Sequence, residues 1–209
     1  MERKMNMPTK KIVLLLGILI LTALFALTVS DCLGEGLEIY DKTLRLHVLA
    51  NSDSAEDQAL KLKVRDKVLE CLSDDLSDCN TKEEAVAVVD GMKEKIKKAA
   101  SEVISDEGKS YNVELTVTEE YYPERAYEGI SLPAGRYTSV RVLLGEAEGQ
   151  NWWCVLFPQV CTDTATPVDE KLTEVGFSAN QIKLLTKQEE PEYRIRFKIV
   201  ELLAALIGR

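Results

Sequence analysis

The chain has 209 residues, with 26 lysines and arginines against 35 aspartates and glutamates and a formal net charge of −9 at pH 7. This length suits a single domain with a core large enough to fold unaided. The excess of acids, without a basic stripe interleaved with aromatic residues, argues against nucleic acid as a partner.

The first 30 residues combine a basic lead with a long uncharged segment. Four bases come first: Arg3, Lys4, Lys10 and Lys11. The uncharged segment IVLLLGILILTALFALTVS follows from Ile12 to Ser30. Basic residues ahead of an apolar segment stay in the cytoplasm, so we expect the rest of the chain to be exported across the membrane. Because the apolar run is longer than the usual signal-peptide core of about 7–15 residues, a cleaved signal and an uncleaved anchor both stay open.

Three parts are therefore predicted along the chain. Residues 1–30 are a signal peptide or a membrane anchor, and residues 12–30 contact the membrane if they are not removed. Residues 31–42 are expected to be a linker, and residues 43–209 to be a single extracytoplasmic domain. Lipid attachment at Cys32 is disfavoured, because an aspartate precedes it where lipoprotein processing needs a small residue.

An exported chain can form disulfides, and four cysteines lie in the predicted domain: Cys71, Cys79, Cys154 and Cys161. Three pairings are possible, and the sequence does not choose among them. We favour Cys71 with Cys79 and Cys154 with Cys161, because each bridge closes a short loop. Cys32 is left over in this scheme.

The domain opens with a strand that leads into a helix. Apolar residues at every second position predict the strand: Leu44, Leu46 and Val48. Three polar residues that follow are candidate helix N-caps: Asn51, Ser52 and Asp53. The helix is expected over residues 55–72, where side chains at intervals of four form one apolar stripe: Leu60, Val64, Val68 and Leu72.

A second helix and three strands follow. The helix is predicted from Thr81 to about residue 105, because Thr81 and Glu84 match a capping box. Apolar and polar residues alternate over residues 111–122, YNVELTVTEEYY, which predicts a strand with one solvent-exposed face. Residues 140–144 alternate again, and the polar loop GEAEGQ then leads into NWWCVLF at residues 151–157. Two strands joined by a short glycine-containing loop predict a hairpin.

The C-terminal part reads as a loop with one short helix over residues 162–181, followed by an apolar block from residue 199 to 207. Just before this block, apolar and aromatic residues alternate with bases over residues 193–199, as in a strand. We favour a terminal helix for the end of the chain, with a strand as the close alternative. The expected fold class is α+β, in which N-terminal helices pack on a mainly antiparallel sheet, preceded by the signal or anchor segment.

The sequence offers little for catalysis. His47 is the chain's one histidine, so Cys154 with His47 is the one available Cys–His pair near the tryptophans, and no local motif supports it. The cysteine spacings match no zinc pattern, and a G-x-S-x-G elbow is missing from the sequence. We therefore expect a protein that works by binding, with no catalytic residues, no metal or other cofactor and no small-molecule substrate.

The two adjacent tryptophans, Trp152 and Trp153, must point to opposite faces of a strand. The strand is apolar on both faces. It is therefore either central and covered on both sides, or packed on the core with one face and open to a partner with the other. The second reading makes one tryptophan a candidate contact residue.

Three motifs in this chain resemble the stage II sporulation protein R family of endospore-forming bacteria. They are R-x-x-V-x-A-N-S-D-S-x-x-D-Q-x-L-K from Arg45 to Lys61, Pro-Ala-Gly-x-Tyr from Pro133 to Tyr137, and N-W-W-C-V-L-F-P from Asn151 to Pro158. They occur in the order that the family has.

The resemblance implies an intercellular signal. Such a protein is exported from the forespore into the space between the two membranes around it. There it activates a membrane-embedded aspartic protease of the mother cell, which matures the precursor of sigma E. The candidate partner-binding residues are Trp152 or Trp153, with Asn51 and Asp53 in the turn before the first helix. The alternatives are an exported cell-wall hydrolase and a passive anchored scaffold.

Overall fold

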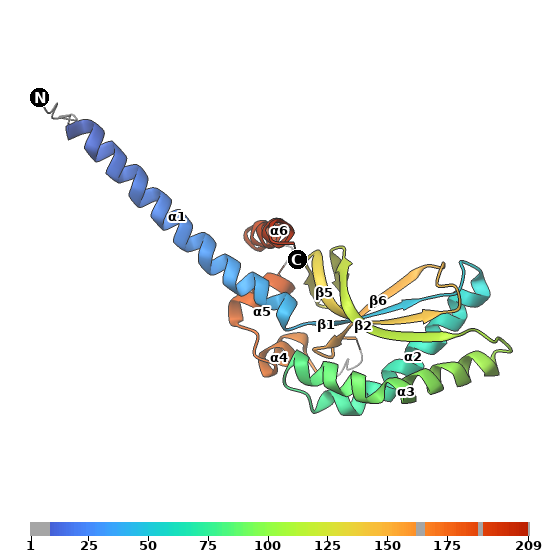
Figure 1. Cartoon of the computed structure of the whole chain (residues 1–209). Coiled ribbons are helices and arrows are strands. Elements are labelled where there is room, and N and C mark those ends of the chain that lie inside the picture. The colour runs from blue at the N-terminus through green and yellow to red at the C-terminus, as the bar shows by residue number, and fades with distance from the viewer. Residues whose placement is uncertain (1–8, 162–165, 188–189, 209) are drawn as a thin grey trace, which may run out of the picture.

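The computed structural model describes residues 9–161, 166–187 and 190–208 and has an α+β fold, as the sequence predicts (Figure 1). The helices are α1 Thr9–Asp41, α2 Ala55–Ser77, α3 Lys82–Asp106, α4 Val168–Glu174, α5 Ala179–Thr186 and α6 Pro191–Leu206. The strands are β1 Leu44–Leu49, β2 Val113–Tyr122, β3 Arg125–Tyr127, β4 Ile130–Leu132, β5 Gly135–Leu144 and β6 Asn151–Phe157.

The main sheet is mixed, with the strand order β2-β5-β1-β6, and β3 pairs with β4 in a small second sheet. The predicted hairpin of β5 and β6 is wrong, because β1 lies between them, parallel to β5 and antiparallel to β6. Leu46 of β1 thus faces Val140 on one side and Cys154 on the other. The loop after β5 crosses the end of β1, where Gly149 N–H donates to the carbonyl of Ala50 (3.0 Å).

One face of the sheet shares a core with α2 and α3. The predicted stripe of α2 is buried in it, as are alternating residues of β1 and β5 and the inner face of α3. The buried members include Leu60, Val64, Val68, Leu72, Leu46, Val48, Val140, Val89 and Ile96. A period of about 3.6 on the helices and of 2 on the strands thus directs one apolar surface of each element into the same core.

The helix caps differ in part from the prediction. Ser54, one residue after the candidates, caps α2, and its hydroxyl accepts from the N–H of Asp57 (3.1 Å). Thr81 caps α3 as predicted, accepting from Glu84 N–H (3.2 Å). The Glu84 carboxylate accepts from the N–H of Asn80 (2.7 Å), one residue before the cap. Both helices therefore begin with side chains that satisfy free N–H groups.

The opposite face of the sheet is covered as well, by a second core that draws on α1, the β3–β4 pair and the C-terminal helices. Figure 1 shows α2 and α3 along one side of the sheet and α6 on the other. Residues 31–42, expected to be a linker, instead continue α1 to Asp41, and Ile39 and Tyr40 are buried. The Tyr40 hydroxyl donates to the carbonyl of Ala134 (2.9 Å), which fixes the end of α1 to the turn before β5.

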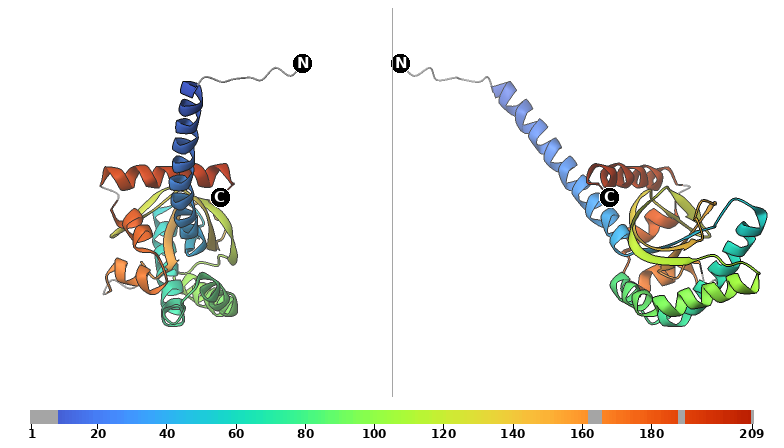
Figure 2. Two further views of the ribbon diagram at one scale, coloured as in Figure 1. Left: turned by 90° about the vertical axis from the view of Figure 1, so that its left-hand side faces the viewer. Right: turned by 45° about the vertical axis from the view of Figure 1, so that its right-hand side comes forward.

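The N-terminal part of α1 projects away from the domain (Figures 1 and 2). Its large apolar side chains from Ile12 to Leu21 are exposed. No helix among the described residues combines the length and apolar character that a membrane crossing needs. The side chain of Cys32 and the bases Arg3 and Lys4 lie outside the described residues.

The C-terminal part contains two short helices, α4 and α5, where one was expected, and the terminal helix α6 is confirmed. Ser178 and Gln181 form a capping box at the start of α5 that the sequence reading missed. Phe197 and Val200 of α6 are buried in the second core, so the alternation seen at residues 193–199 does not reflect a strand.

The crossing of β1 by the loop after β5 predicts a stability difference between two glycines. A Cβ at Gly149 would lie 2.3 Å from the carbonyl oxygen of Ser52, whereas a Cβ at Gly91 in α3 meets nothing within 4 Å. Gly149→Ala should therefore lower the free energy of unfolding by about 1–3 kcal/mol, and Gly91→Ala should raise it by about 0.5–1 kcal/mol. Urea unfolding measures both. Equal midpoints for the two variants would contradict this packing.

Candidate partner-binding site around the paired tryptophans

The strand that holds both tryptophans, β6, is an edge strand of the sheet. Val155 donates its N–H to Cys161 Sγ (3.3 Å), on the side away from β1. Hydrogen-bonding groups alternate sides along an antiparallel strand, so the N–H and C=O groups of Asn151 and Trp153 point to the same outer edge. Among the described residues, none outside the sheet hydrogen-bonds to the main chain of Trp153. This short outer edge is open.

Trp152 and Trp153 point to opposite faces, as the alternation predicts, and both are half-buried. Of the two alternatives for this strand, the structure agrees with coverage on both faces, because the sheet has a layer on each face, although β6 is an edge strand and not a central one. Trp152 packs on the core of α2 and α3, and the guanidinium of Arg65 lies 4.8 Å from its ring centroid. Trp153 packs on the second core under Arg125, at 4.2 Å.

His47 links three strands beneath Trp153. Its ring centroid lies 5.7 Å from that of Trp153, and its side chain is buried. Nδ1 lies 2.9 Å from the carboxylate of Glu120 on β2, and Nε2 lies 2.6 Å from Oδ1 of Asn151 on β6. Both ring nitrogens are therefore engaged inside the protein, and the contact with Asn151 fixes the start of the open edge.

Glu120 is the most enclosed carboxylate of this network. Burial raises the pKa of Glu120, but the hydrogen bond and charge of His47, with the charge of Arg141 and the hydroxyl of Ser139, outweigh burial and hold the pKa below its ordinary value. The Ser139 hydroxyl donates to Glu120 (3.3 Å), and Arg141 Nε lies 3.5 Å away. The carboxylate is thus stabilised in its charged form.

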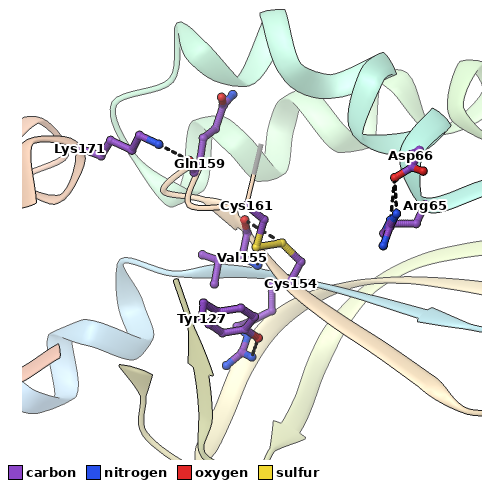
Figure 3. The surroundings of a disulfide bond; sticks show 9 residues. Arg65, Asp66, Tyr127, Cys154, Val155, Gln159, Cys161 and Lys171 are labelled. Carbon is purple, nitrogen blue, oxygen red and sulfur yellow. Dashed lines mark hydrogen bonds and ion pairs between the residues drawn. A yellow bond between two sulfur atoms is a disulfide. The ribbon is translucent and has the colours of Figure 1, made fainter. Parts of the chain in front are cut away.

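A disulfide joins Cys154 and Cys161, as favoured from the sequence, with their Cα atoms 6.4 Å apart (Figure 3). This bridge removes the thiol from the Cys–His pair. In addition, Cys154 pairs with Leu46 on the face opposite His47. The thiol reading is therefore contradicted by both chemistry and geometry.

The predicted bridge between Cys71 and Cys79 is wrong, because both cysteines are free. Cys71 lies in α2 and Cys79 just beyond its end. Eight residues of helix rise about 12 Å, well beyond the Cα separation of about 7 Å that a disulfide tolerates. Burial, followed by the nearby carboxylate of Glu84, raises the pKa of the Cys79 thiol.

The turn before α2 lies at the same end of the sheet as the start of β6, because Leu49 faces Asn151. Asn51 binds within the protein: its Nδ2 donates to Asp57 (2.9 Å), and its Oδ1 accepts from the N–H of Glu146 (3.0 Å). It therefore ties the turn to the loop before β6. Asp53 is exposed beside it.

Arg45 and Asp57 are buried residues of the motif region that sequence reasoning missed. Arg45 is 0% exposed and stacks 4.1 Å from the ring centroid of Tyr122, and it donates to the hydroxyl of Tyr127. Asp57 is 3% exposed and also accepts from the hydroxyl of Tyr111 (3.0 Å). Arg45 alternates with the apolar residues of β1 and Asp57 lies in the first turn of α2, positions at which charged side chains are usually solvated. A second layer covers Arg45, and a polar turn covers Asp57.

A cavity of about 470 Å³ lies beyond the other end of β6, between the end of α2, the start of α3 and α4. Phe157, Gln159 and Lys171 line it together with Cys79. Lys171 donates to the carbonyl of Gln159 (3.2 Å), so its charged end is held against the cavity wall. Its lining is mixed in polarity, and within the described residues no cluster of three or more metal-binding side chains occurs.

Comparison with known proteins identifies the family. The family model described as stage II sporulation protein R matches residues 40–166, and the chain belongs to this family. The chain is 36% identical over 128 residues to stage II sporulation protein R of Bacillus subtilis (strain 168), which is 61% of this chain and 57% of the relative. The chain thus matches little more than half of the relative's length. No solved structure gives a significant match.

The lowered pKa of Glu120 predicts a pH-dependent stability. The contribution of this carboxylate is present above the ordinary glutamate pKa of about 4.3, and it is lost as the pH falls through the lower pKa of folded Glu120. Glu120→Gln should therefore destabilise the protein at pH 7, and the difference from wild type should shrink below pH 4. Urea unfolding across pH measures it, with the exposed neighbour Glu119→Gln as the matched control. A constant difference at every pH would argue against the charged pair.

Proposed function

We propose that this chain is a secreted sporulation signal that activates a membrane-embedded aspartic protease, which then matures the sigma E precursor. Membership of the stage II sporulation protein R family supports a role in sporulation. The basic lead, the apolar segment after it and the disulfide of Cys154 with Cys161 support export from the forespore into the intermembrane space. Residues 12–30 hold the protein at the membrane if they are not removed.

The main structural support for this proposal is the open edge of β6. Main-chain N–H and C=O groups at Asn151 and Trp153 can add an extended segment of the protease as a further strand. Trp152 and Trp153 flank that edge, one on each face, and an arginine stacks on each of them. Half-buried tryptophans beside an open strand are typical of the residues that dominate binding energies. Asp53 lies at the same end of the sheet and extends the surface.

Activation follows from differential binding. A ligand shifts an equilibrium only if it prefers one state, so the protein must bind the active conformation of the protease more tightly than the inactive one. Ordering an extended segment of the protease on β6 gives such a preference, because the segment gains its hydrogen bonds in one conformation alone. This mechanism needs no catalytic residue in the signal itself.

An exported cell-wall hydrolase is the rival from another class. Its thiol form conflicts with the disulfide of Cys154. Its carboxylate form would need an accessible acid and base, whereas Glu120 is engaged by His47, Arg141 and Ser139. A passive anchored scaffold would need the anchor for function, whereas a signal would act without it.

Two substitutions at one position test the edge directly. Asn151→Pro removes an outward N–H without removing a bond to β1, since proline is tolerated at the first residue of an edge strand. Asn151→Ala loses the same side chain and keeps the N–H. Co-expression with the protease and the sigma E precursor should give mature sigma E with Asn151→Ala and little or none with Asn151→Pro. Equal activity of the two folded variants would dismiss strand addition.

The tryptophans are tested in the same assay. Trp152→Ala or Trp153→Ala should weaken binding to the protease by about 2 kcal/mol or more, which is roughly 30-fold in affinity. Urea unfolding separates this loss from a loss of stability. If both variants are folded and fully active, the receptor does not contact this strand.

A further inference from the structure

The terminal helix α6 carries apolar residues on two opposite faces. Phe197, Val200 and Ala204 face inward and are buried in the second core. A second set is exposed: Ile195 (63%), Ile199 (37%), Leu202 (62%) and Leu206 (73%). Their spacings of four, three and four residues place them in one stripe on the outward side of the helix. Soluble surfaces rarely leave such a continuous apolar stripe uncovered.

Contacts on its inner side hold α6 in a fixed position. A Cβ at Gly36 of α1 would lie 2.3 Å from a methyl group of Val200, so the two helices cross at close range. The Glu201 carboxylate accepts from the N–H of Ala134 (2.6 Å), and Lys198 pairs with Glu124. The exposed stripe is therefore presented by a helix that is anchored to both α1 and the sheet.

The position of α6 relates the stripe to the apolar part of α1. Figure 2 shows α6 lying across α1, on the side of the domain from which α1 projects. The exposed apolar side chains of α1, from Ile12 to Leu21, thus continue away from the same side. Six residues of helix from Gly36 to Ser30 rise about 9 Å, close to the helix diameter of about 10 Å. The outward stripe of α6 therefore lies near the level at which the apolar segment of the sequence ends.

Basic residues flank the stripe. Arg194 and Lys198 lie on one side of it and Arg196 on the other, and all three are exposed, although Lys198 also pairs with Glu124 and Glu201. The chain as a whole carries a net charge of −9, whereas α6 holds three bases within five residues against two acids, Glu192 and Glu201. A helix with an apolar face bordered by bases lies in the interface of a lipid bilayer, with the bases at the headgroups.

We propose that α6 lies flat in the surface of a lipid bilayer, with Ile195, Ile199, Leu202 and Leu206 among the acyl chains. This docking goes beyond the proposed signalling role, and α6 lies outside the residues 40–166 that the family model matches. It fixes the height and orientation of the sheet above the membrane. The open edge of β6 is then presented at a constant distance from the bilayer.

Depth-dependent quenching tests the docking. The full chain is reconstituted in vesicles of phosphatidylcholine and phosphatidylglycerol, with or without bromine on the acyl chains. Leu202→Trp adds a fluorophore to the stripe. Lys98→Trp adds one to α3, at a position where the lysine side chain is 80% exposed. The unsubstituted chain supplies the background of Trp152 and Trp153. We expect brominated lipid to quench the added emission of Leu202→Trp and to leave that of Lys98→Trp unchanged.

Two results would overturn the proposal. If aqueous iodide quenches Leu202→Trp and brominated lipid does not, the stripe faces water. If neither agent quenches it, the stripe is covered by protein, such as a second copy of this chain. Leu206→Trp, on the same stripe, repeats the test in case one substitution disturbs the helix. Both tryptophan variants carry the same α1. Insertion of α1 into the membrane therefore cannot by itself produce a difference in quenching between Leu202→Trp and Lys98→Trp.

Discussion

The structure depends on the insertion of β1 between β5 and β6. Leu44, Leu46 and Val48 on one face of β1 are fully buried, and so are Arg45 and nearly all of His47 on the other. A strand buried on both faces needs a layer on each side, which α2 and α3 supply on one and the second core on the other. This same insertion makes β6 an edge strand and so leaves its outer main chain open.

The buried polar groups of β1 explain how the edge is held in place. His47 spans from Glu120 on β2 to Asn151 on β6, and the disulfide of Cys154 with Cys161 fixes the other end of the strand. Arg45 has no carboxylate partner among the described residues, and tyrosine rings surround its guanidinium. The bonds of His47 to Glu120 and Asn151 hold only in this strand order and register, so they favour one arrangement of the strands. A rigid edge loses less entropy when a partner binds.

Local patterns predicted the elements well and their arrangement poorly. The stripe of α2, the cap Thr81, the strands β1 and β2 and the opposite faces of the tryptophans all follow from short-range periodicity. The prediction of a β5–β6 hairpin was wrong because a short loop makes two strands neighbours only when no strand from elsewhere in the chain inserts between them. The linker prediction was wrong because the acids and glycines scattered through residues 31–38 indicated irregular chain, whereas Ile39 and Tyr40 at the end of this segment are buried. The burial of Arg45 was missed because alternation in β1 does not reveal a second layer supplied by the C-terminal half of the chain.

Under the proposed function, a folded domain with an open β6 edge is sufficient to activate the protease. The most direct measurement adds purified protein without residues 1–30 to vesicles that contain the protease and the sigma E precursor, with the extracytoplasmic side of the protease outward. The precursor should be cleaved, and cleavage should saturate with the concentration of the added protein. A folded domain that leaves the precursor uncut at every concentration would contradict the proposed function.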